Sequence, residues 1–243
     1  MPGGGGVKGG GTATGKPDPK CVELDEKNKA ERKKFIEKTR RKKELTKQEE
    51  TALAKARRGG MTFSSAESSI GGTTSSMTQS SSGLVNDQIT KDLSGGTSEQ
   101  KMGLNQKTRN STAKKHDAKK KKAGVLCDGS HVHPGGGKGA HGECKIFNNL
   151  TNEVGAASMR GGSVLLNIDW RRNTPNGGVQ NSGMPCEDCY AMLCHAVCEC
   201  EIEIMICDKN NKPTPLTEEN CQDEYDGYSD LCTRVDGGPK PGR

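Results

Sequence analysis

The sequence predicts an α/β fold, in which a mixed sheet carries helices on its faces, preceded by a largely disordered leader. Three observations predict it. Hydrophobic residues make up only 29% of the 243 residues and aromatic residues 3%, too few for one core spread over the whole chain. The charge changes sign along the chain. Strand and helix patterns alternate in the second half, an order that requires crossover connections and a partly parallel sheet.

The charge divides the chain near residues 122–124. Residues 1–124 contain 27 Lys and Arg against 14 Asp and Glu, whereas residues 125–243 contain 10 against 17. Ten of the eleven cysteines, the single Trp170 and all three tyrosines lie in the second part. We therefore expect one folded domain over residues 123–243 and no large core before it.

The leader is expected to contain three parts. Residues 1–21 have the composition of a Gly-rich disordered tail. Residues 22–58 lack Gly and Pro, which predicts a charged, solvated helix that ends at Gly59. Residues 59–122 have the Ser, Thr, Gly and Lys content of a linker. The basic run 114–122 could contact phosphate groups, but we favour a solvated linker end because no aromatic residue is interleaved for base stacking.

The second part alternates between strand and helix patterns. In chain order we expect a short strand over 125–127, a loop over 128–140, a helix over 141–150, a strand over 163–170, a loop over 171–184, a helix over 186–199, a strand over 201–208 and an irregular segment over 209–243. Cys144, Phe147 and Leu150 share one face of the first helix. The strand over 163–170 is rich in apolar and β-branched residues.

Two short motifs stand at the starts of the two helices, His141-Gly142-Glu143 and Pro185-Cys186-Glu187-Asp188-Cys189. Cys186 and Cys189 are three residues apart, so both thiols face one side of a helix and can bind one metal ion. The helix N-terminus favours their thiolate forms. His141 can provide a third ligand, and zinc with three protein ligands keeps a fourth position for water. Glu143 could then remain unligated and transfer protons.

Together the two motifs resemble the signature of the zinc-dependent cytidine deaminase superfamily, H-x-E followed by P-C-x-x-C. The resemblance covers about residues 120–210. It implies a three-layer cytidine-deaminase-like fold, in which each motif begins a core helix and a strand lies between them. It also implies that His141, Cys186 and Cys189 bind Zn²⁺ and that Glu143 is the catalytic proton carrier.

A variable leader before a short catalytic domain is similar in layout to the deaminase domains of bacterial polymorphic toxins. The resemblance implies a secreted effector that converts cytosine to uracil in nucleic acid, either DNA or RNA, in the cytoplasm of a target cell. It implies a cognate immunity protein as a further partner. The first 20 residues contain no apolar segment typical of an ordinary signal peptide, and no apolar run is long enough to predict a membrane partner.

Other functions stay open at this point. A free cytidine or nucleotide deaminase in the cytoplasm is one alternative, and a non-enzymatic binding module stabilised by zinc or disulfides is another. The acidic balance of residues 125–243 disfavours a nucleic-acid groove there. Two arrangements would still allow one. The basic leader could supply the contact with the backbone, or the acidic residues could lie away from a groove lined by the basic residues around the motifs, Lys138, Lys145, Arg160, Arg171 and Arg172.

Further residues are candidates for substrate contact or metal binding. His133 in the loop before the first motif, Asn167 and Trp170 on the middle strand, and Ser182 before the second motif could contact a base, although Trp170 could equally anchor the core. His131 and His133 could instead be ligands in a small metal-dependent nuclease. The sequence does not decide whether the remaining cysteines are free, bridged or metal-bound, namely Cys194, Cys198, Cys200, Cys207, Cys221 and Cys232.

Overall fold

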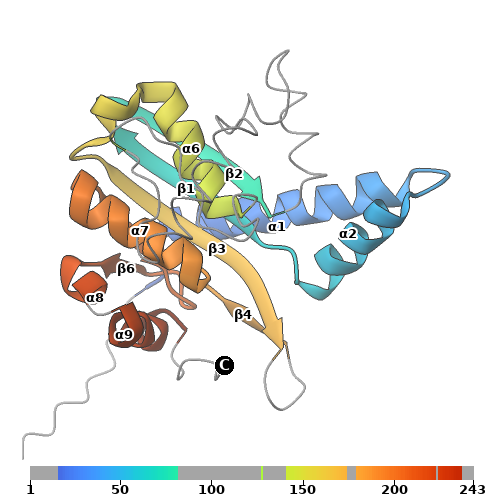
Figure 1. Ribbon diagram of the computed structural model, residues 1–243. Helices are drawn as coiled ribbons and strands as arrows, with labels where there is room; N and C mark the ends of the chain where they lie inside the picture. Colours follow the sequence, from blue (N-terminus) through green and yellow to red (C-terminus); the bar gives the residue numbers. More distant parts are fainter. Residues whose placement is uncertain (1–15, 82–126, 128–140, 174–178, 223, 237–243) are drawn as a thin grey trace, which may run out of the picture.

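A computed structural model describes residues 16–81, 127, 141–173, 179–222 and 224–236 (Figure 1). These residues form a mixed α/β fold with helices on both faces of a sheet, as the sequence predicts. The strands are β1 (Phe63–Ile70), β2 (Thr73–Ser80), β3 (Ser163–Asn173), β4 (Val179–Ser182), β5 (Glu203–Cys207) and β6 (Pro213–Leu216). Their order in the sheet is β2-β1-β3-β5-β6, and β4 pairs with the carboxyl-terminal end of β3, residues 170–173.

The described helices are α1 (Pro19–Arg40), α2 (Lys47–Arg58), α6 (Gly142–Val154), α7 (Glu187–Cys200), α8 (Glu218–Gln222) and α9 (Glu224–Asp236), with a 3₁₀ turn over Ala156–Met159. Helices α6 and α7 lie on one face of the sheet, and α1 lies on the other (Figure 1). No helix in the described part of the chain is long and apolar enough to cross a membrane.

Strand direction places the starts of α6 and α7 at one end of the sheet. Strand β1 is antiparallel to both β2 and β3, so β2 and β3 run in the same direction. Strand β5 is parallel to β3. Gly142 at the start of α6 lies against the carboxyl end of β2, next to the Gln79 carbonyl, and Gly183, shortly before α7, lies next to the Cys207 carbonyl at the carboxyl end of β5. The two motifs therefore start at the same end of the sheet.

The main core lies between the sheet and the helices α6, α7 and α9. Val164 and Leu166 of β3 belong to one buried cluster with Phe147 of α6 and Leu193 of α7. Helix α9 adds Tyr228, whose ring meets the ring of Tyr190 edge to face with centroids 5.1 Å apart. Alternate residues of a strand face opposite sides, so the intervening residues of β3 face α1.

Helix α1 is bound to the sheet by buried polar contacts. Asn28 Nδ2 donates to Asn167 Oδ1 at 2.9 Å, and Ser65 Oγ donates to Asn28 Oδ1 at 2.8 Å. Arg32 Nε donates to Asp169 Oδ2 at 2.8 Å, and both side chains are only 8% exposed. The Arg32 guanidinium also lies 4.6 Å from the centroid of the Phe63 ring. These contacts make α1 one layer of the domain.

The prediction that residues 16–81 belong to a largely disordered leader outside the domain is therefore wrong. The structure places α1 against the sheet and turns residues 63–80, expected to be linker, into the hairpin β1–β2. The serine-rich composition of this segment is typical of a linker, but Ser64, Ser65 and Ser68 are buried in β1. Pairing with the neighbouring strands satisfies their backbone hydrogen-bonding groups there. The domain consequently does not begin at residue 123.

Further elements differ from the expectation. The single helix over 22–58 is two helices, because Thr46 and Glu49 form a capping box that starts α2. Gly59 ends α2 in a left-handed conformation with φ of 80°, as predicted. The segments expected to be loop or irregular contain β4, β6, α8 and α9. Three predicted segments lie wholly or partly outside the described residues. They are the tail predicted over residues 1–21, of which 1–15 are not described, the linker beyond residue 81 with its basic run 114–122, and the short strand over 125–127 except for Cys127.

Three disulfides answer part of the question about the cysteines. They join Cys21 to Cys207, Cys127 to Cys200 and Cys194 to Cys221. The first fastens α1 to β5, and the third fastens α7 to α8. Cys144, Cys186, Cys189, Cys198 and Cys232 take part in none of these disulfides.

We predict that Arg32→Met lowers the free energy of unfolding by about 3–5 kcal/mol, because it leaves Asp169 buried without its charged partner. Chemical denaturation measures the loss. Lys34→Met is the matched control on the same helix. Lys34 is 71% exposed and pairs only with Glu31 at 3.3 Å, so its removal should change stability by no more than about 0.5 kcal/mol.

Replacing both partners, as in Arg32→Met with Asp169→Leu, should recover much of the loss, because no uncompensated charge remains buried. Equal stability of Arg32→Met and Lys34→Met would contradict the structural role assigned to α1.

Candidate metal centre

The first motif is held against the sheet at the start of α6. His141 is the N-cap residue and makes no side-chain capping hydrogen bond. A Cβ on Gly142 would lie 2.7 Å from Ser64 Oγ and 3.0 Å from the Gln79 carbonyl oxygen, so glycine is what allows α6 to begin this close to the hairpin. One turn later, the buried Lys145 donates from Nζ to the carbonyl of Ser80. The hairpin β1–β2 therefore fixes the position of His141.

The second motif is held by α9. Cys186 is the N-cap residue of α7. Just before it, the Gly183 amide donates to Asp236 Oδ1 at 3.0 Å, and Tyr228 Oη donates to the Pro185 carbonyl at 2.9 Å. The helix at the end of the described chain thus sets the path by which the chain enters α7.

The two helix starts bring His141, Cys186 and Cys189 together. Cys186 Sγ lies 3.3 Å and Cys189 Sγ 3.4 Å from His141 Nδ1, and the three ligand atoms lie within 4.8 Å of one another. Tetrahedral zinc, with Zn–S of about 2.3 Å and Zn–N of about 2.0–2.1 Å, would place sulfur and nitrogen about 3.6 Å apart. Two thiols and one imidazole at these separations fit a zinc ion.

The acid–base state of the thiol pair also suits a cation. A hydrogen bond from the Cys189 thiol lowers the pKa of Cys186 to about 4, and His141 acts in the same direction. The same hydrogen bond, together with burial, raises the pKa of Cys189. The pair without metal thus holds one thiolate and one thiol. A divalent cation stabilises the second thiolate and displaces its proton.

Glu143 lies beside this group. Its side chain is buried, with 2% of the residue exposed, and its Oε2 lies 3.9 Å from Cys189 Sγ. Burial raises the pKa of Glu143 to about 7, and the negative charge of Cys186 adds to the shift. A carboxyl group poised near neutral pH can accept and return a proton under physiological conditions.

Comparison of the chain with protein-family models, with curated proteins and with solved structures gave no match.

The residues predicted to contact substrate, Asn167, Trp170 and Ser182, do not all lie on the face of the sheet that carries the metal-ligand group. Asn167 faces α1 and is bonded to Asn28, so it lies on the face of the sheet opposite the metal-ligand group. The expectation that it contacts substrate is corrected, because it is an odd-numbered residue of β3 and alternation turns it away. Trp170 is half-buried, and alternation places it on the same face as Leu166 and the site. Ser182 pairs with Trp170 in the β3–β4 ladder.

His131 and His133 lie outside the described residues, so the structure does not test the nuclease alternative or the expectation that His133 contacts substrate. Sequence reasoning missed Lys145, Tyr228 and Asp236, which position the two motifs. For Lys145 the sequence contains one indication. It lies four residues after His141, and this spacing places the two residues on the same side of a helix. Nothing in the sequence pattern around Tyr228 and Asp236 indicated that α9 packs against the second motif.

We predict one zinc ion per chain in purified protein, measured by elemental mass spectrometry. Cys186→Ser should remove it or weaken its binding by at least about tenfold, because a hydroxyl is a poor substitute for a thiolate ligand. Cys198→Ser is the matched control. Cys198 is an exposed free thiol on the same helix and lies outside the ligand group, so this variant should retain one zinc. Full zinc content in Cys186→Ser would refute the ligand assignment.

Proposed function

We propose that this protein is a zinc-dependent hydrolytic deaminase that converts cytosine to uracil in nucleic acid and acts as a secreted bacterial toxin. The observation that carries the proposal is the convergence of His141, Cys186 and Cys189 from two helix starts, with the buried carboxyl group of Glu143 beside them. Three ligands and an adjacent acid–base group are the parts that such a reaction needs.

The order of elements supports a cytidine-deaminase-like fold. H-x-E stands at the start of α6, β3 follows, and P-C-x-x-C stands at the start of α7. This is the order that the resemblance to the deaminase superfamily implies. The parallel strand β5 follows α7 and pairs with β3. The two motifs are 45 residues apart from His141 to Cys186 in the chain, so their meeting in space is a stronger indication than either motif alone.

Zinc bound by His141, Cys186 and Cys189 would supply a Lewis acid that makes hydroxide available near pH 7. Glu143 would take the proton of the attacking water. The water oxygen bonds to the amino-bearing carbon of the base, and Glu143 delivers a proton to the adjacent ring nitrogen. The remaining proton of the former water would then pass from the new hydroxyl through Glu143 to the amino group, the carbon–nitrogen bond would break, and ammonia would leave with uracil as the other product.

Burial of Glu143 favours an enzyme over a structural zinc module. An ionisable group in an apolar surrounding costs free energy of folding, and a module that only binds zinc needs no such group beside its ligands. Perturbed carboxyl groups at a metal centre are typical of catalytic sites. The three disulfides favour an exported protein, since disulfides form and persist mainly in oxidising compartments. An immunity protein that covers the site would be the expected partner in the producing cell.

We predict that Glu143→Gln lowers the deamination rate by at least about a hundredfold, because the amide cannot carry the proton, while one zinc per chain is retained. Ammonia release and mass spectrometry of the product would be measured on single-stranded DNA, double-stranded DNA, RNA and free cytidine. Glu153→Gln, an exposed change on the same helix, is the control and should react like the wild type.

Deamination that survives Glu143→Gln would refute the mechanism. Turnover of free cytidine alone would replace the nucleic-acid substrate by a nucleoside. Zinc without turnover of any of the four substrates in the wild type would favour the non-enzymatic module.

A further inference from the structure

The cations of α1 differ between its two halves. In the first half, lysine side chains are neutralised by nearby carboxylates. Lys20 pairs with Glu67, Lys27 with Glu23 at 2.7 Å, and Lys29 with Asp25 at 2.8 Å. Beyond Arg32 this pairing largely stops. Among the described residues, Lys33, Lys38 and the C-cap residue Arg41 are exposed and form no ion pair, whereas Lys34 pairs with Glu31 and Lys42 with Glu49.

This difference defines a basic arm, residues 33–58, made of the second half of α1, the connection to α2, and α2 itself. The arm contains 11 Lys and Arg against four Glu. Its apolar residues Phe35, Leu53 and Ala56 are buried, so the helices pack on each other and present their charged sides outward. The only large hydrophobic residue exposed in the described part of the chain is Val22, outside the arm.

The basic arm leaves and rejoins the sheet at the end where the metal centre lies. The arm begins directly after Arg32, which forms an ion pair with Asp169 of β3. The chain re-enters the sheet at Phe63, the residue of β1 that pairs with Asp169 in the β1–β3 ladder. The neighbouring Ser64 is the residue that Gly142 packs against at the start of α6. Figure 1 shows α2 and the end of α1 extending beyond the sheet. The root of the arm is therefore adjacent to the first motif, on the opposite face of the sheet.

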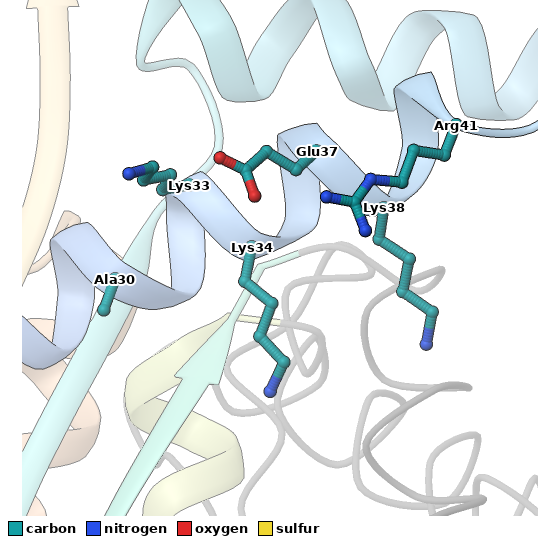
Figure 2. Close-up of a pocket in the computed structure, with 6 residues that line it drawn as sticks. All are labelled: Ala30, Lys33, Lys34, Glu37, Lys38 and Arg41. Atoms are coloured by element: carbon teal, nitrogen blue, oxygen red, sulfur yellow. The ribbon is translucent and has the colours of Figure 1, made fainter.

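One side of the arm lines a hollow of about 510 Å³. Its described lining residues are Ala30, Lys33, Lys34, Glu37, Lys38 and Arg41. Lys34 and Lys38, one helical turn apart, extend from α1 in the same direction (Figure 2). None of the metal ligands lines this hollow, so it is separate from the catalytic centre. A row of cations along one side of a helix matches the repeated charges of a phosphate backbone.

We propose that the basic arm binds the sugar–phosphate backbone of the nucleic-acid substrate and holds the strand beside the metal centre. The identity of the polymer rests on the proposed function. Charge carries the inference: residues 125–243, which contain every candidate metal ligand, have 17 acidic residues against 10 basic ones. Their net charge disfavours attraction of a polyanion, whereas the net positive charge of the arm favours it. Because the arm exposes no aromatic residue among those described, the contact is to phosphates and is independent of sequence.

The test measures binding of a fluorescein-labelled strand of thirty thymidines to the full-length protein by anisotropy. This strand contains no cytosine, so binding is observed without turnover. The variant Lys33→Gln/Lys38→Gln/Arg41→Gln should raise the Kd at least about tenfold. It should also reduce the slope of log K against log salt by about 2, since each lost phosphate contact on a single strand removes about 0.7.

The matched control is Lys20→Gln/Lys27→Gln/Lys29→Gln. It removes the same three charges from the same helix, but from side chains that carboxylates already neutralise. The Kd should change by less than about threefold and the salt slope should stay unchanged. Circular dichroism melting should show all three proteins folded, because every substituted side chain lies at the surface of α1.

Equal weakening in both triple variants would overturn the proposal, because binding would then follow net charge and not the arm. An unchanged Kd in the arm variant would overturn it too. So would arm-dependent binding to phosphatidylserine vesicles with no binding of the thymidine strand, which would make the arm a membrane surface.

The outcomes also separate the arm from the proposed function. Arm-dependent binding without deamination of a cytosine-containing strand would refute the deaminase and leave the arm in place. Glu143-dependent deamination with arm-independent binding would refute the arm alone.

Discussion

The direction of two strands is the constraint on which the rest of the molecule depends. Because β1 is antiparallel to both β2 and β3, the chain twice leaves the sheet at the same end and twice returns across the same face. The helices that make these crossings must then begin side by side. His141 and Cys186 are the N-cap residues of α6 and α7, so the ligand atoms meet without any long side chain reaching across a gap. The positive ends of both helices point toward the thiols and favour their ionised forms.

Strand β3 divides the molecule into two different interiors. Its even-numbered residues contact an apolar core with α6 and α7, whereas Asn167 and Asp169 contact Asn28 and Arg32. On the side of the apolar core, Glu143 is buried beside Cys189, and this burial raises the pKa of its carboxyl group. The polar side fixes the direction of α1 through hydrogen bonds whose geometry is more specific than apolar contact. As a result, the basic half of α1 emerges in a defined orientation at the end of the sheet where the candidate metal ligands lie.

The sequence predicted the half of this arrangement that contains the candidate metal ligands well and the leader poorly. Helix periodicity, the apolar run over 163–170 and the two motifs were strong local signals, and the structure brings His141, Cys186, Cys189 and Glu143 together. The hairpin β1–β2 could not be predicted, because Phe63–Ile70 contains four serines and its strand character comes from its neighbours in the sheet. Asn167 was misplaced because the strand was identified without assigning its faces. The pairing of Cys21 with Cys207 depends on the tertiary position of α1, which no local pattern contains.

That same disulfide changes what a protease can do to the molecule. Cys21 and Cys207 are 186 residues apart in sequence and enclose β1, β2, α6, β3 and α7 in one covalent ring. A single cut anywhere inside the ring leaves one molecule of unchanged mass apart from an added water, and both fragments stay attached through sulfur. Separation then requires a reductant, so processing in an oxidising environment and release of the fragments in a reducing one become two independent events.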